Sequence, residues 1–110
     1  MNIEKIRDYC LSKKSVTEGF PFGDQTLVFK VSGKMFATLS LSGESRMNLK
    51  CNPERAIELR EYHHYVIPGY HMNKKHWNTV LYEFASEDEM KEWINHSYEL
   101  VYNSLPEKKK

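Results

Sequence analysis

The sequence predicts an α+β fold: a two-layer sandwich in which two terminal helices pack on one face of a mostly antiparallel sheet. Three observations support this prediction. Near both ends of the chain, apolar residues recur at steps of three and four, which is typical of a helix with one buried side. Between these ends, residues 26–51 alternate between apolar and polar side chains across two short turns, which is typical of antiparallel strands. The length of 110 residues suits a single domain, which we assign to residues 1–106, followed by a basic tail at 107–110.

The first helix is expected to begin after Asn2, whose side chain can cap it, and to end near residues 13–15. Its apolar positions keep to one side, and they are Ile3, Ile6, Cys10 and Leu11. A stretch at 19–24 then contains two glycines and a proline, which interrupt helical structure, so we expect a turn there.

Three strands are expected at residues 26–31, 34–41 and 46–51, joined by a tight turn at 32–33 and a second turn at 42–45. Because neighbouring residues of a strand point to opposite faces, the alternation predicts which side chains the helices bury. This predicted set is Leu27, Phe29, Val31, Met35, Ala37, Leu39, Leu41, Met47, Leu49 and Cys51.

A second helix is expected to follow Asn52, which can cap it, and to run to about residue 61. Short strands are expected at 65–67 and 78–82, with a turn at 68–69 after the first of them.

The final helix is expected to begin at a capping box made by Ser86 and Glu89 and to end near residues 105–106. Each terminal helix has one apolar stripe, and two stripes cover one face of a five- or six-stranded sheet. The opposite face of the sheet is therefore expected to be open to solvent.

The predicted open face combines four cations with one aromatic ring and no carboxylate. Its residues are Val28, Lys30, Lys34, Phe36, Thr38, Ser40, Arg46, Asn48 and Lys50. The cations suit contacts with phosphates, and the ring of Phe36 suits stacking on a base. The alternative is an ordinary hydrated face, since antiparallel sheets commonly place Lys, Thr and Ser toward water.

A second dense patch lies at residues 71–78, where basic, amide and aromatic side chains follow one another. As a phosphate-binding loop it would use Lys74 and Lys75 as cations, Asn73 and Asn78 as hydrogen-bonding groups and Trp77 as a stacking surface. The alternative is structural: the tryptophan is packed, the asparagines hold turns and the lysines are hydrated.

The sequence contains no pattern that predicts an enzyme, a cofactor site or a metal site. It has no glycine-rich phosphate loop and no nucleophile elbow. Cys10 and Cys51 fall on predicted buried positions, where thiols behave as small hydrophobic groups, and the histidine spacings match no zinc site. Two unpaired thiols and the lack of a membrane-length apolar run predict a cytoplasmic protein without membrane contact.

Five stretches of the chain, in order, resemble the MmcQ/YjbR family of small bacterial proteins. They are Phe20-Pro21-Phe22-Gly23, residues 29–37, Asn48-Leu49-Lys50-Cys51, residues 68–78 and residues 97–106. The resemblance implies a frataxin-like (CyaY-like) fold and DNA binding by two hairpin loops, the "double wing". By position, the wings correspond here to the turns at 32–34 and 42–46. The resemblance to frataxins also suggests iron binding, which in frataxin-type proteins goes with an acidic ridge along the first helix. The first helix predicted here lacks such a ridge, so we expect no iron site.

Residues and resemblance together predict a non-enzymatic, monomeric protein that binds DNA weakly and with little sequence preference. The predicted nucleic-acid-binding residues are Lys30, Lys34, Phe36, Arg46, Asn48, Lys50, Lys74, Lys75 and Trp77. The alternative is a protein-interaction module whose open sheet face or Trp77 loop binds a protein partner. A third hypothesis is a small-molecule pocket beside Phe20, Phe22 and Tyr70.

Overall fold

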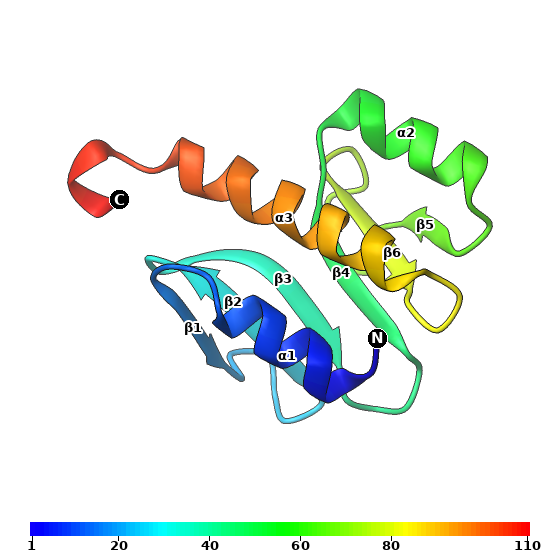
Figure 1. Cartoon of the computed structure of the whole chain (residues 1–110), viewed down its shortest axis with the longest axis horizontal. Coiled ribbons are helices and arrows are strands. Elements are labelled where there is room, and N and C mark those ends of the chain that lie inside the picture. The colour runs from blue at the N-terminus through cyan, green and yellow to red at the C-terminus, as the bar shows by residue number, and fades with distance from the viewer.

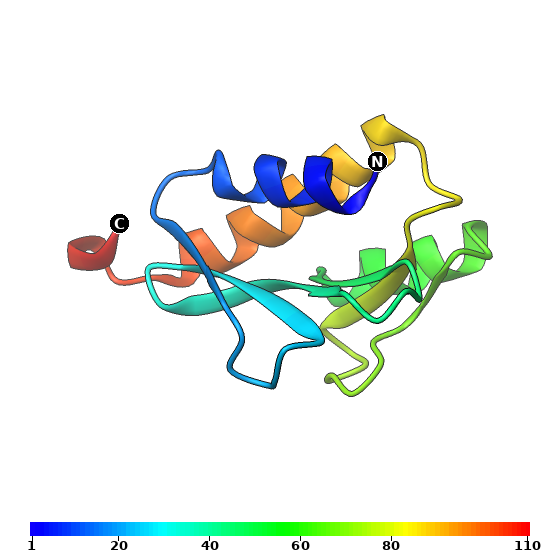
Figure 2. The same cartoon turned by 90° about the horizontal axis from the view of Figure 1, so that it is seen from below.

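The computed structural model describes residues 1–110 and has two layers, with three helices on one face of a six-stranded sheet (Figures 1 and 2). The strand order is β1-β2-β3-β4-β6-β5, and every neighbouring pair is antiparallel. The predicted fold class is confirmed. No helix has the length and apolar character needed to cross a membrane. The elements are α1 (Ile3–Leu11), β1 (Val16–Gly19), β2 (Thr26–Val31), β3 (Lys34–Ser40), β4 (Arg46–Lys50), α2 (Pro53–Tyr62), β5 (Val66–Pro68), β6 (Trp77–Leu81), α3 (Glu87–Ser104) and a 3₁₀ turn (Glu107–Lys109).

The three helices begin at the caps that the sequence predicts. The side chain of Asn2 accepts a hydrogen bond from a backbone N–H of α1, and that of Asn52 does the same for α2. At α3, the hydroxyl of Ser86 accepts from the N–H of Glu89, whose carboxylate accepts from the N–H of Ser86. These side chains satisfy N–H groups that the first helical turn leaves without a partner.

The hydrophobic core lies between the helices and the sheet, as the alternation predicts. Met35 and Leu41 are only partly buried, but the other members of the predicted inward set are fully buried. The principal core residues from α1, α3 and the meander are Ile6, Cys10, Leu27, Phe29, Val31, Ala37, Leu39, Met47, Leu49, Ile94 and Val101.

The prediction that Phe36 lies on the open face is wrong. The pairing of β2 with β3 shifts by one residue, so that Phe29 opposes Ala37 while Lys30 opposes Met35, and Phe36 is the extra residue of a β-bulge. A bulge interrupts the alternation of side chains. Phe36 is therefore 0% exposed, and its ring meets the ring of Tyr98 of α3 edge-on at 5.4 Å.

The same bulge corrects the prediction for Lys34. After the shift, Lys34 lies opposite the buried Val31, on the helix side of the sheet. Its Nζ donates a hydrogen bond of 2.9 Å to the hydroxyl of Ser104 in α3. Met35 takes the position on the open face, beside Lys30.

Ser97 of α3 joins the helix layer to the sheet beside the bulge. Its hydroxyl donates to the carbonyl of Phe36 and accepts from the N–H of Lys50 at 2.9 Å. The Ser97 side chain is fully buried, so it provides the Phe36 carbonyl and the Lys50 N–H with hydrogen-bond partners at a place that water does not reach.

The edge strand β1 was not among the strands that the sequence predicts. It is only four residues long, and two of its side chains, Thr17 and Glu18, are polar and exposed. Glu18 pairs with Arg7 of α1 at 2.7 Å, and this contact lowers the pKa of the carboxyl group. At the other end of the chain, the 3₁₀ turn lies near the β2–β3 turn, where the hydroxyl of Ser32 donates to the carbonyl of Lys109.

Candidate functional site

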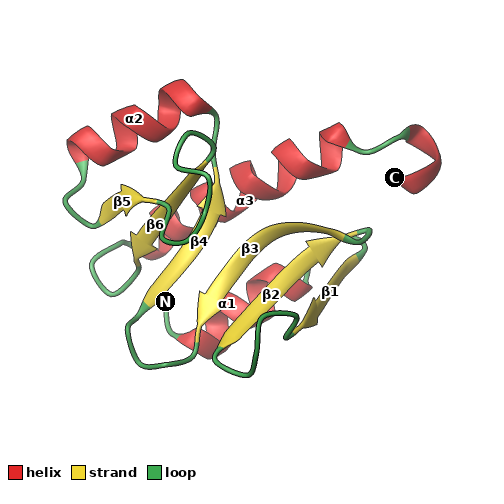
Figure 3. Cartoon of the chain, turned by 180° about the vertical axis from the view of Figure 1, so that it is seen from behind, coloured by secondary structure: helices red, strands yellow, loops and turns green.

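The open face is the side of the sheet that the helices do not cover, and Figure 3 shows it from the front. Lys30, Arg46, Asn48 and Lys50 lie on this face, as predicted, because they alternate with buried residues of β2 and β4. No strand residue on this face is a carboxylate: Glu18 of β1 opposes the buried Phe29 and so lies on the helix side.

Two loops stand on the open face and frame its centre. Residues 20–25 connect β1 to β2, and residues 69–76 connect β5 to β6. Figure 2 shows both connections on the side of the sheet away from the helices. A groove lies on the open face between these two loops and is lined by residues of both.

In the patch at 71–78, Trp77 is packed and Asn73 holds a turn, as the structural alternative expects, whereas Asn78 lies in β6. Trp77 is 8% exposed, which rules out its predicted role as a free stacking surface or as an exposed docking residue. Asn78 is buried, and its amide oxygen accepts a hydrogen bond from Arg60 of α2. Asn73 accepts from two backbone N–H groups of its own turn, and Lys74 donates through Nζ to the carbonyl of Gly69. Both predicted cations of this patch, Lys74 and Lys75, are exposed.

A closed set of hydrogen bonds fastens the 69–76 loop to the sheet. The N–H of Tyr70 donates to the hydroxyl of Thr79 at 2.8 Å, and that hydroxyl donates to the side-chain oxygen of Asn48. The side-chain nitrogen of Asn48 donates to the carbonyl of Tyr70 at 3.2 Å. Asn48, predicted as a ligand-binding residue, therefore has both ends of its amide engaged and positions Tyr70.

Arg46 of β4 lies between Tyr70 and the β3–β4 turn. Its guanidinium carbon is 4.1 Å from the centre of the Tyr70 ring, which is a cation–π contact. Its Nη1 is 2.9 Å from Oε2 of Glu44 in the turn. Glu44 also accepts a hydrogen bond from the hydroxyl of Ser42, which in turn lies 2.9 Å from the hydroxyl of Ser40.

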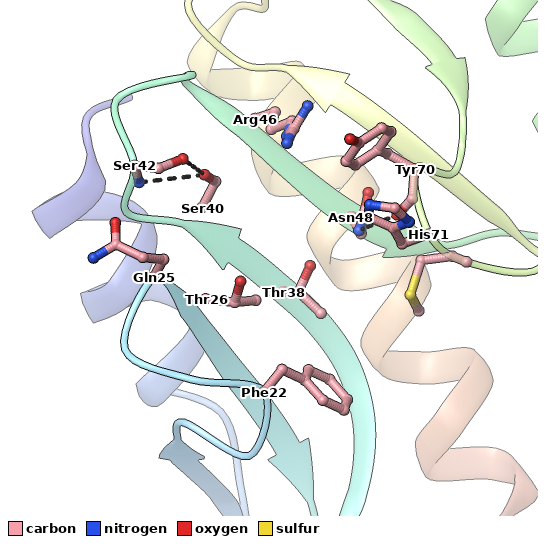
Figure 4. Close-up of a pocket in the computed structure, with 11 residues that line it drawn as sticks. Phe22, Gln25, Thr26, Thr38, Ser40, Ser42, Arg46, Asn48, Tyr70 and His71 are labelled. Atoms are coloured by element: carbon pink, nitrogen blue, oxygen red, sulfur yellow. Dashed lines mark hydrogen bonds between the residues drawn. The ribbon is translucent and has the colours of Figure 1, made fainter.

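The groove has a volume of about 530 Å³ and a polar floor between apolar walls. The floor comes from β2, β3 and β4, while Phe22 stands on one wall and Tyr70 on the other (Figure 4). Its lining residues are Phe22, Gln25, Thr26, Thr38, Ser40, Ser42, Arg46, Asn48, Tyr70, His71 and Met72. None of them is a carboxylate, and Arg46 carries the permanent positive charge.

One wall residue of the groove has an unusual backbone conformation. His71 has a φ of 59°, in the left-handed region that residues other than glycine seldom adopt. Its ring lies 4.0 Å from the ring of Tyr70, measured between centres. Such conformations persist where surrounding contacts hold them, and they occur often at binding sites.

The sequence-based hypotheses cover part of this groove. Thr38 and Ser40 were predicted on the open face, and Phe22 and Tyr70 were proposed to border a small-molecule pocket. Phe20, the third residue of that hypothesis, is half-exposed and does not line the groove. The lining residues to which sequence analysis gave no role are Gln25, Thr26, Ser42, His71 and Met72, although the last two lie in the patch at 71–78 that it singled out. Most of these lie in loops, where the period of two gives no information.

No group of three or more His, Cys, Asp or Glu side chains is close enough to hold a metal ion. Both cysteines are unpaired and buried. Burial raises the pKa of the Cys10 thiol to about 12, and burial also raises the pKa of Cys51 despite the nearby charges of Arg55 and Arg60. Both thiols are consequently held in the neutral form, which is a poor nucleophile.

His96 of α3 and Cys51 line a small cavity of about 10 Å³ between the helices and the sheet. Burial, together with the charge of Arg55, lowers the pKa of His96 below its usual 6.5, and its Nε2 accepts a hydrogen bond from the N–H of Asn52 at 3.2 Å. The neutral form of the imidazole is therefore the one that the fold stabilises.

This environment makes the stability of the fold depend on pH. Below pH 6.5 the unfolded chain binds a proton at His96 that the folded chain resists, so stability is lost as the pH falls through that value. We expect the free energy of unfolding of the wild type to fall, relative to that of His96→Gln, between about pH 7.5 and about pH 5.5. Urea unfolding followed by tryptophan fluorescence measures the difference. The exposed His64, replaced in His64→Gln, is the control, and parallel curves for wild type and His96→Gln would contradict the prediction.

Sequence comparison places the chain among known proteins. A family model described as YjbR matches residues 11–100, which includes both loops of the groove and all six strands. The chain belongs to the YjbR family. The resemblance to MmcQ/YjbR proteins noted in the sequence is thereby confirmed.

Two bacterial relatives and two solved structures illustrate the likeness of this YjbR-family chain. It is 41% identical to the uncharacterized protein YbdF of Escherichia coli O157:H7 over 78% of the chain and 72% of the relative. It is 30% identical to the uncharacterized protein YjbR of Escherichia coli K12, over 100% of the chain and 95% of the relative. The crystal structure of Deinococcus radiodurans protein DR2400 matches with a TM-score of 0.91 and 36% identity, covering 98% of this chain and 84% of the other. A crystal structure from Pseudomonas syringae matches with a TM-score of 0.79 and 28% identity, covering 92% and 99%.

Proposed function

We propose that this YjbR-family protein is a binding protein whose ligand is a small organic molecule held in the groove of the open face. The observation that carries the proposal is a cavity of about 530 Å³ that has hydrogen-bonding side chains on its floor and aromatic rings on its walls. Sites for small molecules typically have volumes of ~300–1,000 Å³ and combine apolar walls with a few polar groups that orient the ligand.

The distribution of charge favours a compact ligand over an extended polyanion. Of the six cations predicted to bind phosphates, only Arg46 lines the groove, and Lys34 lies on the helix side of the sheet. A groove with one guanidinium and many neutral donors and acceptors suits a ligand that carries a single charged group.

A groove-filling variant tests the proposal. We expect members of a small-molecule fragment library to shift the backbone amide signals of groove residues in ¹H–¹⁵N spectra of the wild type. Ser40→Trp places an indole in the groove and is expected to abolish these shifts while the rest of the spectrum is preserved. Thr17→Trp, on the open face of β1 but outside the groove, is the matched control and should bind as the wild type does. Fragments that bind equally to wild type and Ser40→Trp, or a library without any groove binder, would overturn the proposal.

DNA is the second candidate ligand, supported by the carboxylate-free strands of the open face and by the lysines Lys30 and Lys50 on the same face. The two hairpin turns that the family resemblance assigns to DNA binding, at 32–34 and 42–46, lie at opposite ends of β3. If DNA is the ligand, the fluorescence anisotropy of a labelled duplex rises with protein at low salt and this binding weakens steeply as salt increases. In that case Lys30→Gln weakens binding to the duplex, whereas fragment shifts in the groove stay unchanged.

A further inference from the structure

A carboxylate that belongs to the protein itself, that of Glu44, lies beside the end of the groove nearest the β3–β4 turn. Glu44 places Oε2 at 2.9 Å from Nη1 of Arg46, and its Oε1 accepts a hydrogen bond of 2.9 Å from the hydroxyl of Ser42. One guanidinium and one hydroxyl thus bind the two oxygens of one carboxyl group. Of these three residues, Ser42 and Arg46 line the groove and Glu44 does not.

The Arg46 guanidinium is held in a position where it can bind the carboxylate of a ligand in place of that of Glu44. The ring of Tyr70 covers one face of the guanidinium at 4.1 Å, and Tyr70 is itself fixed to the sheet through Asn48 and Thr79. The nearest contact of Glu44 with the guanidinium is to Nη1, and the guanidinium has five N–H donors arranged to match a carboxylate. The Arg46 side chain is also partly open to solvent, at 26%.

The contact made by Glu44 is weak enough to be exchanged. The Glu44 side chain is 49% exposed, and ion pairs at such exposed positions contribute little, because water screens them. Glu44 also lies in a turn between Gly43 and Ser45, and its side chain makes no hydrogen bond or ion pair other than those with Ser42 and Arg46.

We infer that the groove takes an organic carboxylate with an aromatic or apolar body, and that its carboxylate replaces that of Glu44 on Arg46 and Ser42. This inference rests on the proposed function and adds the class of ligand. The body of the ligand extends across Thr38 toward Phe22, which Figure 4 shows at the far end of the groove from Ser42 and Arg46. Glu44 is then an internal competitor that occupies the anion position until a ligand arrives.

Two probes with the same phenyl body distinguish the effect of the ligand's negative charge on binding from the effect of its shape. Phenylacetate carries the carboxylate, and phenylacetamide is its neutral counterpart of nearly the same size. Dissociation constants for both are measured from ¹H–¹⁵N shifts of groove residues in the wild type, Glu44→Gln and Arg46→Lys. Glu58→Gln, on the exposed side of α2, removes one negative charge far from the groove and is the matched control.

We expect Glu44→Gln to tighten phenylacetate binding by up to about fivefold, the factor that corresponds to an exposed ion pair, and to leave phenylacetamide unchanged. Arg46→Lys keeps the charge but loses the guanidinium fork, and it is expected to weaken phenylacetate by about tenfold. Glu58→Gln is expected to match the wild type with both probes.

Three results would overturn the inference: equal binding of the two probes, no gain in Glu44→Gln, or shifts caused by phenyl phosphate but not by phenylacetate. Each of these leaves the proposed function intact if neutral fragments still shift groove signals in the wild type and not in Ser40→Trp. Failure of every probe and every fragment to shift groove signals overturns both.

Discussion

Phe36→Ala is expected to lower the free energy of unfolding by about 3–5 kcal/mol, which is the range for removing a buried phenylalanine ring. Phe36 is 0% exposed and contacts the rings of Phe29 and Tyr98, so its removal leaves a cavity between β3 and α3. Since small domains are stable by only ~5–15 kcal/mol, this loss is a large part of the total.

Urea unfolding followed by circular dichroism measures this effect. The matched control is Met35→Ala, because Met35 is the neighbouring residue of β3, lies on the open face and is only partly buried. We expect a clearly smaller loss for the control. A loss for Phe36→Ala no greater than that for Met35→Ala would contradict the assignment of Phe36 to the core. For the same reason, Phe36→Ala is a test of stability and not a test of surface binding.

Gly69→Ala is expected to destabilise the protein by about 1–3 kcal/mol and to weaken ligand binding in the groove, because it overpacks the base of the 69–76 loop. A Cβ atom at this position would lie 2.9 Å from both the Cβ and the carbonyl oxygen of Trp77, and 3.1 Å from the Cβ of Met72. The N–H of Gly69 also donates to the carbonyl of Trp77 at 3.0 Å. Relief of the clash must move the loop away from β6, and Tyr70 and Met72 move with it.

The two effects of Gly69→Ala are measured separately, the first by urea unfolding and the second by the fragment shifts of groove signals. Gly19→Ala is the matched control: nothing lies within 4 Å of the added Cβ at this position, and its φ is not in the left-handed region. We expect the control to be as stable as the wild type and to bind the same fragments. A Gly69→Ala protein that retains both stability and binding would show that the loop tolerates displacement.

The elements that sequence analysis predicted well are those with local causes. Asn2, Asn52 and the Ser86–Glu89 pair each satisfy backbone groups within three residues of themselves, so the start of every helix can be predicted from a short window. The strands of the meander follow from a period of two that holds over most of residues 26–51. β1 was missed because four residues carry too little of such a pattern.

The bulge in β3 marks the point at which local pattern and tertiary packing disagree. Around Phe36 the alternation is obscured by three consecutive apolar residues, Met35, Phe36 and Ala37, and extending the period of two from residues 38–41 back through them places Phe36 outward. In the structure the ring turns inward because burial against Phe29 and Tyr98 outweighs regular pairing, and Ser97 supplies the hydrogen bond that the interrupted ladder needs. The helix that provides these partners is about sixty residues away in the sequence.

The amino-acid sequence by itself determined the α+β class, the helix starts, the buried face of the meander and the membership of the YjbR family. Only the tertiary structure decided that the open face is a groove, that Trp77 is packed and that Arg46 is paired with Glu44 beneath the Tyr70 loop. The physical reason is the distance along the sequence between the residues that make each contact. Caps and alternation arise from contacts a few residues apart, whereas the groove depends on contacts such as that between Asn48 and Tyr70, which are 22 positions apart and form only when the sheet has assembled.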